Sequence, residues 1–280
     1  MPERPSRRKF LAALAAGSAI TVSGCASVVE SVNGSGGETP TESGEVPVSN
    51  ASQSTPEPTQ TANGTSAAEE TETEEQWSID EVTISEPSVS LSSVTLPEDD
   101  VAYPTMGDAD ETLTVYGSWK CPYTREFVLT QFPSLVDEFV RSGDVSVQFR
   151  SVAYRGGEPF LGVDAPRSTR AGLAVWETDP ESFWEYFTYV FANQPQERYR
   201  WGKPALLTRF AGAADVSDPS EIRQAASDES AYESRIEQTL TDADENDIWT
   251  VPRVVYDGEV TAPTLDAEST REQFEAAADE

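Results

Sequence analysis

The sequence contains no histidine, only two cysteines, and 19 basic residues against 50 acidic ones in 280 residues. The absence of histidine excludes Ser-His and Cys-His catalysis and every histidine-ligated metal site. Cys25 and Cys121 lie in quite different sequence contexts, so we do not expect a structural disulfide between them, and two cysteines are too few for a zinc site. We therefore expect no metal ion and no other cofactor.

Positive charge is scarce, and only Lys9, Lys120 and Lys203 are lysines. The formal net charge is −31, and the acidic residues are spread through every segment of the chain. Because a protein that binds nucleic acid needs an extended basic surface to displace phosphate counterions, this charge argues against a nucleic-acid partner. An acidic surface throughout is typical of halophilic proteins, since very high salt screens the repulsion between carboxylates.

The first 24 residues have the features of an export signal. Ser6-Arg7-Arg8-Lys9 precedes the apolar stretch Phe10–Val22, which is too short to span a bilayer. This order resembles a twin-arginine signal, and Val22-Ser23-Gly24-Cys25 resembles a lipobox, whose cysteine is lipidated and becomes the mature N-terminus. We expect residues 1–24 to be removed and a lipid on Cys25 to anchor the exported protein at the extracellular face of the cell membrane.

The next segment, residues 25–76, is rich in Ser, Thr, Glu, Gly and Pro and is predicted to be a disordered stalk. Three N-glycosylation sequons begin at Asn33, Asn50 and Asn63 and all lie in this stalk, as expected of a segment displayed outside the cell. In residues 77–104 apolar residues recur two apart, which predicts an extended lead-in to the folded domain.

The most informative stretch begins with the apolar run Leu113–Tyr116, which predicts a strand, and continues to Cys121. Pro122 suits the first position of a helix, and apolar residues then recur at helical spacing as far as Val140, with a kink expected at Pro133. Cys121 is therefore the predicted N-cap of this helix. There, free backbone N–H groups and the helix dipole favour a nucleophilic thiolate.

The rest of the chain predicts a second strand, a group of helices and a closing β-β-α unit. The alternation in 145–152 predicts the second strand and completes a β-α-β unit. Helical patterns follow at 168–177, 180–193, 204–213, 219–226 and 232–244. Strands are expected at 250–258 and 259–260, and a helix at 268–278. This order predicts an α/β sheet with helices on both faces and a helical subdomain over one edge.

Over about residues 105–280 the chain resembles DsbA-like members of the thioredoxin superfamily. The likeness rests on four features, namely Gly107-Asp108-Ala109-Asp110 before the first strand, Cys121-Pro122-Tyr123 at the helix start, the helical stretch from Ala171 to Gln194, and Thr250-Val251-Pro252. It implies a thioredoxin-like fold with a helical insertion at about 165–247. It also implies a cis Pro252 that faces Cys121, with the Val251 backbone pairing with an extended substrate chain. The alternative is a trans proline that only starts a strand.

The resolving cysteine of this family is absent, because Thr124 occupies its position. Thr124 can hydrogen-bond a Cys121 thiolate but cannot break a mixed disulfide. Three interpretations stay open. The protein is a monothiol isomerase or reductase that acts on exported cysteine-containing proteins with a small external thiol as resolver, or a non-catalytic binder of extended chains, or a structural lipoprotein with a relic cysteine. We favour the first.

The predicted catalytic residues are Cys121, Thr124 and Pro252, and the predicted substrate-binding residues are Trp119, Pro122, Tyr123, Thr250 and Val251. Lys120 is a candidate for favouring the thiolate by its charge, and Trp119 is alternatively a large residue at the rim. Asp242-x-Asp244-x-Asn246 resembles the start of a calcium loop. Its glycine and glutamate positions are Asp247 and Arg253, so acidity at a helix end is the better interpretation.

The export hypothesis predicts the effect of Cys25→Ser. Without the thiol that accepts the lipid, the protein should be released from the membrane fraction or stay unprocessed. Cell fractionation with N-terminal mass analysis measures both outcomes. A wild-type protein found in the cytosol with residues 1–24 intact would contradict export and anchoring together.

Overall fold

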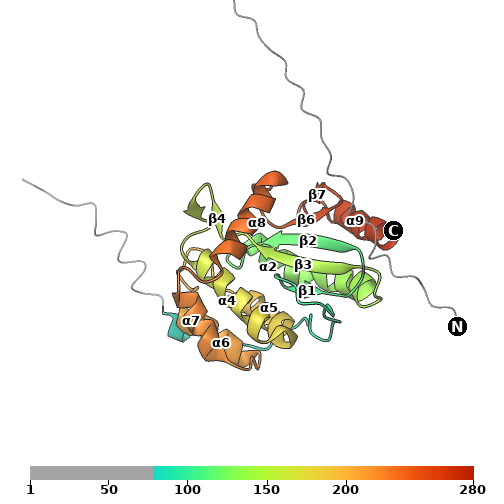
Figure 1. The fold of residues 1–280 in the computed structure, drawn as a ribbon. Coiled ribbons are helices and arrows are strands. Elements are labelled where there is room, and N and C mark those ends of the chain that lie inside the picture. The colour runs from blue at the N-terminus through green and yellow to red at the C-terminus, as the bar shows by residue number, and fades with distance from the viewer. Residues whose placement is uncertain (1–77) are drawn as a thin grey trace, which may run out of the picture. The chain divides into compact units, whose positions relative to one another are not determined.

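The computed structural model describes residues 78–280. The predicted signal peptide, the lipidation of Cys25, the stalk and its sequons lie outside the described residues. A five-stranded sheet with the order β1-β3-β2-β6-β7 occupies the centre of the domain (Figure 1). Its strands are β1 (Thr105–Met106), β2 (Thr112–Gly117), β3 (Ser146–Ser151), β6 (Arg253–Tyr256) and β7 (Glu259–Thr261). Only β2 and β3 run parallel, as in the predicted β-α-β unit, and the thioredoxin-like fold is confirmed.

The helix that follows β2 is interrupted beside Pro133, as the sequence predicts. It consists of α2 (Pro122–Thr130), α3 (Phe132–Leu135) and the π-helical segment η2 (Val136–Val140). A proline inside a helix lacks the N–H for one backbone hydrogen bond and clashes with the preceding turn, which explains the break at Gln131.

The inserted helices occur close to the predicted positions. They are α4 (Asp164–Thr178), α5 (Pro180–Ala192), α6 (Pro204–Ala213), α7 (Pro219–Ser227) and α8 (Glu233–Glu245), and α9 (Ala267–Ala278) closes the domain. The starts of α5, α7 and α9 have local causes, since Asp179, Asp218 and Asp266 each accept backbone N–H groups of the first turn. Within residues 78–280 no helix combines the length and the apolarity that a membrane crossing requires.

A two-stranded hairpin precedes α4 and is absent from the sequence prediction. It pairs β4 (Tyr154–Arg155) with β5 (Glu158–Pro159) around Gly156 and Gly157, both at positive φ. Each strand has only two residues, which is too short for an alternating pattern to be recognised. The hairpin matters because the chain that leaves it contributes to the candidate site.

The lead-in is part of the folded domain. After the short 3₁₀ helix η1 (Ile79–Glu81) it has no helix or strand until β1, in keeping with the expected extended course. Arg209 donates to the carbonyl oxygens of Ile79 and Val82, and Asn193 exchanges two hydrogen bonds with the Ser85 backbone. Side chains of the domain therefore hold this segment through its backbone.

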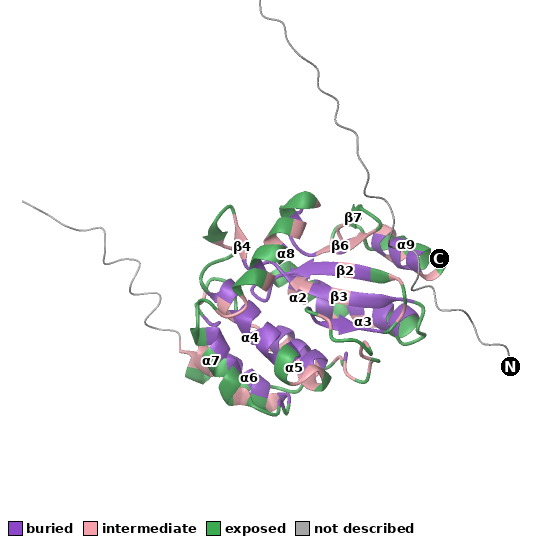
Figure 2. Cartoon of the chain, in the orientation of Figure 1, coloured by how far each residue is buried: buried purple, intermediate pink, exposed green. Residues whose placement is uncertain are grey.

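The main core joins the sheet to the helix that follows β2, to α9 and to the inserted helices, and Trp119 makes five of its ring contacts. The buried residues are concentrated in β2, β3 and the inner faces of α4 and α5 (Figure 2). The Trp119 ring stacks on Phe191 at 5.4 Å and makes edge or tilted contacts with four further rings, those of Phe149, Phe183, Tyr186 and Phe187. The aromatic stripe of α5 is thus core, as expected from its helical spacing.

Trp119 also determines which residue α4 can carry where the two meet. A Cβ placed on Gly172 would lie 2.5 Å from the Trp119 ring, whereas a Cβ on Gly212 of α6 would meet no atom within 4 Å. We predict that Gly172→Ala lowers the free energy of unfolding by roughly 1–3 kcal/mol through overpacking. Gly212→Ala should raise it by up to about 1 kcal/mol because alanine is the better helix former. Urea denaturation measures both, and equal effects would contradict the packing described.

Candidate active site

The site is built at the end of β2, where the chain turns into α2. Cys121 is the N-cap of α2, with extended backbone angles, and Pro122 is its first residue, as predicted. Gly117 allows α2 to approach the sheet, because a Cβ there would lie 2.8 Å from Thr124 and 2.7 Å from the Phe149 ring. The close approach places Cys121 at the end of β2.

The Cys121 sulfur is turned toward the loop that precedes β6. Its thiol donates to the carbonyl oxygen of Val251 across 3.6 Å, and it makes no capping hydrogen bond with the first turn of α2. The Val251–Pro252 peptide bond is cis, as the resemblance implied. The expected contact between the sulfur and free helix N–H groups is therefore replaced by a contact with Val251. The side chain is only 4% exposed, so a reaction partner must reach it through the groove beside it.

A groove of about 330 Å³ opens at Cys121. Five predicted site residues line it, namely Cys121, Pro122, Tyr123, Thr250 and Val251. The sequence prediction missed the rest of the wall, which includes Phe160 and Leu161 after the β4–β5 hairpin, Leu265 before α9, Glu197 and Arg253. Tyr123 and Leu265 are 60% and 82% exposed, and solvent-exposed apolar side chains around a cleft are typical of a binding surface.

The structure does not bring Trp119 into this groove. Its side chain is 1% exposed in the aromatic core, so the predicted substrate contact by Trp119, and its alternative as a rim residue, are both corrected. Thr124 is fully buried beneath the corner, and its hydroxyl oxygen accepts the N–H of Ser118 at 3.2 Å. Thr124 thus stabilises the turn between β2 and α2, and its recorded partner is Ser118.

Lys120 also points away from the groove. Its Nζ donates to Asp164 Oδ2 and to the carbonyl oxygen of Tyr199, each at 2.8 Å, and the Lys120 and Asp164 side chains are 4% and 0% exposed. The charge of Lys120 is therefore matched by a buried carboxylate, which corrects its proposed role in favouring the thiolate. Lys120, which directly precedes Cys121, therefore connects α4 and the loop before α6 to the turn between β2 and α2.

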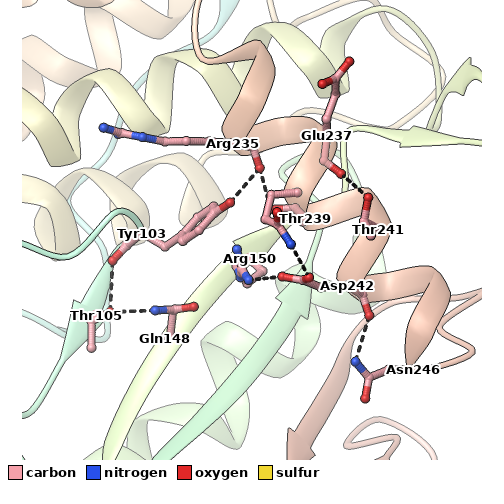
Figure 3. A network of polar contacts seen from close by, with 11 residues as sticks. Tyr103, Thr105, Gln148, Arg150, Arg235, Glu237, Thr239, Thr241, Asp242 and Asn246 are labelled. Atoms are coloured by element: carbon pink, nitrogen blue, oxygen red, sulfur yellow. Dashed lines mark hydrogen bonds and ion pairs between the residues drawn. The ribbon is translucent and has the colours of Figure 1, made fainter. Parts of the chain in front are cut away.

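A second polar network holds the other side of the site. Arg150 of β3 forms an ion pair with Asp242 near the end of α8, and Tyr103 lies under the Arg150 guanidinium at 3.7 Å (Figure 3). Arg155 pairs with Asp244 at 3.1 Å and covers the Trp249 ring at 3.8 Å. Two carboxylates at a helix C-terminus oppose the helix dipole, and these arginines offset that cost. The network positions the chain that carries Val251 and Pro252.

The calcium interpretation stays rejected, because Asp242 and Asp244 are both paired with arginines. No group of three or more cysteine or acidic side chains within residues 78–280 is arranged to hold a metal ion. Tyr116 packs in the same small cluster as Cys121 and Val251, and burial raises the pKa of its phenol. Tyr116 is therefore an uncharged member of the cluster at neutral pH.

This geometry, with a cysteine at a helix start facing a cis-proline loop, belongs to a known class. The family model described as Thioredoxin matches residues 104–280, so the chain belongs to the thioredoxin family. Disulfide bond formation protein D of Bacillus subtilis is 26% identical over 174 residues, which are 61% of this chain and 75% of that protein.

Two solved structures share the fold. BdbD from Bacillus subtilis, in its oxidised form, superposes with a TM-score of 0.57 at 23% identity and covers 67% of this chain and 99% of its own. DsbA of Chlamydia trachomatis superposes with a TM-score of 0.51 at 20% identity and covers 65% of this chain and 96% of its own. The DsbA-like resemblance is confirmed at the level of fold.

The Lys120–Asp164 pair predicts a large effect of removing one partner. Lys120→Met leaves the Asp164 carboxylate buried, with Arg167 at 3.8 Å as its remaining ion-pair partner, and should lower the free energy of unfolding by about 3–5 kcal/mol. Adding Asp164→Leu removes the stranded charge and should recover much of the loss. Chemical denaturation of both variants measures this, and a loss below about 1 kcal/mol in Lys120→Met would contradict a buried pair.

Proposed function

We propose that the protein carries out thiol-disulfide exchange through the single thiol of Cys121. The observation that carries the proposal is the placement of this thiol in an apolar groove, opposite the Val251–Pro252 cis peptide bond. The name of the Bacillus subtilis relative, disulfide bond formation protein D, supports the same general chemistry. The substrates are exported cysteine-containing proteins, whose extended chain lies along Thr250 and Val251 and against Pro122 and Tyr123.

The reaction has two steps with one protein thiol. The Cys121 thiolate attacks a substrate disulfide, which forms a mixed disulfide and releases one substrate thiolate. A different thiol of the same substrate then attacks the substrate sulfur of the mixed disulfide, which forms a new substrate disulfide and releases the Cys121 thiolate, and this is isomerisation. When a small external thiol attacks instead at the Cys121 sulfur, the second substrate thiolate leaves, so the substrate is reduced and the external thiol is joined to Cys121. A second external thiol then attacks this new disulfide, which releases the Cys121 thiolate and leaves the two external thiols joined as a disulfide.

We further propose that the protein works outside the cell, delivered by a twin-arginine signal and anchored through a lipid on Cys25. A stalk between the anchor and the domain gives the groove reach above the membrane surface. Export suits the chemistry, because disulfides form and persist in oxidising compartments.

A second function is favoured by one observation, the 4% exposure of Cys121. The Cys121 thiol is covered and donates to the carbonyl oxygen of Val251. If it does not react, the groove acts only as a non-covalent binding site for extended chains. The two functions differ in one measurable event, which is the appearance of a mixed disulfide on Cys121.

The direct test uses the full chain with Cys25→Ser, which leaves Cys121 as its one thiol. The probe is an unfolded protein with one cysteine, which is joined to a small thiol as a mixed disulfide. This protein should become disulfide-linked to Cys121, and an added thiol should release it. Non-reducing electrophoresis with mass analysis detects the link. Cys121→Ser should abolish the link without unfolding the domain. Binding of the unfolded protein by both forms, with no link in either, would establish the binding module in place of the enzyme.

Thr124→Cys in the same background restores the missing half of the motif. Positions 121 and 124 are one helical turn apart, so we expect an internal disulfide on oxidation and new dithiol oxidase or reductase activity on a model substrate. Loss of the Thr124 hydroxyl, which accepts the Ser118 N–H, should cost about 1 kcal/mol of stability. Thr124→Ser keeps the hydroxyl and serves as the control with no second thiol. An intact fold that never forms the bond would contradict the proposed geometry of the corner.

A further inference from the structure

One residue of the segment between α5 and α6 lines the groove, and this segment is attached to the turn that carries Cys121. Gln194 donates from its side chain to the carbonyl oxygen of Trp119 at 2.6 Å. The carbonyl oxygen of Tyr199 accepts from Lys120 Nζ at 2.8 Å. Both contacts are made by the two residues that precede Cys121, so the segment from 194 to 199 is fixed to the turn between β2 and α2.

Glu197 lies between these two attachment points and lines the groove. Its side chain is exposed, and among the ion pairs recorded for the described residues none includes it. The groove has one other charged residue, Arg253. Its guanidinium is turned back onto its own loop, where it donates to the carbonyl oxygen of Pro252 and to the Thr250 hydroxyl. Arg253 keeps its positive charge but is held against its own loop, whereas the Glu197 carboxylate has no ion-pair or hydrogen-bond partner among residues 78–280 and can turn toward an incoming substrate.

We propose that Glu197 makes the groove selective for disulfides that carry positive charge close to the sulfur atoms. This inference rests on the exchange function proposed above and names its substrate class, which is a cysteine flanked by lysine or arginine in an extended chain. A carboxylate that lines the groove leading to the reacting sulfur attracts such a substrate during approach and in the mixed disulfide, and repels an anionic one. The apolar residues of the groove contact the remainder of the chain.

The whole chain is acidic, so preference for a cation alone does not identify Glu197. The control must change the net charge equally at a remote place. Glu221 is an exposed residue in the first turn of α7 and does not line the groove. Glu197→Gln and Glu221→Gln each remove one negative charge, and a difference between them reports position alone.

The experiment uses the full chain with Cys25→Ser and three small dialkyl disulfides of similar size. These are the cationic cystamine, the neutral bis(hydroxyethyl) disulfide and the anionic dithiodipropionate. Each reaction transfers one half of the probe to Cys121 and releases the other half as a thiol, and mass spectrometry follows the rate. Circular dichroism confirms that each variant is folded at the salt concentration used.

We expect Glu197→Gln to slow the cystamine reaction about two- to five-fold relative to the neutral probe and to speed the dithiodipropionate reaction by a similar factor. Both effects should shrink as salt is raised. Glu221→Gln should change neither ratio by as much as Glu197→Gln does. Equal changes in the two variants, or none in Glu197→Gln, would overturn the selectivity while leaving the exchange function intact.

A second measurement separates this inference from the exchange function. Alkylation of Cys121 by neutral iodoacetamide and by anionic iodoacetate needs no disulfide. Glu197→Gln should raise the iodoacetate rate relative to the iodoacetamide rate more than Glu221→Gln does. If none of the three disulfides reacts with the wild type while alkylation shows this difference, the exchange function is wrong. The effect of Glu197 on charged reagents that reach Cys121 is then still supported. If the alkylation ratio is the same in both variants, the inference about Glu197 is wrong.

Discussion

The site depends on the burial of two adjacent side chains, Trp119 and Lys120, directly before Cys121. Trp119 enters the aromatic core formed largely by α5, and Lys120 reaches Asp164 at the start of α4. The two side chains thus fasten the corner to the inserted helices by different forces, one apolar and one ionic. Because the Asp164 carboxylate is fully buried, loss of the Lys120 charge is costly, and the pair therefore favours the observed position of the turn before Cys121.

Basic residues are few in this acidic chain, and several of them connect segments that are distant in the sequence. Arg209 and Arg141 bind backbone carbonyl groups of the lead-in, while Arg150 and Arg155 hold the end of α8. These contacts join segments that are distant in the sequence. The basic residues described here therefore act mainly by connecting segments of the domain, and Arg253 is the one basic residue that lines the groove with Glu197.

The parts of the fold that the sequence predicted are those with local causes. Pro122 marks a helix start, Pro133 marks its interruption, and the helical period of the insertion follows from burial of one face. The direction of the Trp119 side chain depends on α5, more than sixty residues later, and a local pattern contains no information about it. The groove walls combine Phe160, Glu197 and Leu265 from three separate loops, so half of the site could only be found in three dimensions.

The replacement of a second cysteine by Thr124 has a structural consequence as well as a chemical one. A fully buried position beneath Cys121 would shield a resolving thiol from solvent, but here it carries a hydroxyl that accepts the Ser118 N–H. The hydroxyl stabilises the turn and leaves any mixed disulfide on Cys121 without an internal route to release. The lifetime of that species then depends on which thiols can enter the groove. In the exchange function proposed above, the apolar rim and the charge of Glu197 govern this entry, so the proposal makes one surface responsible for both substrate selection and turnover.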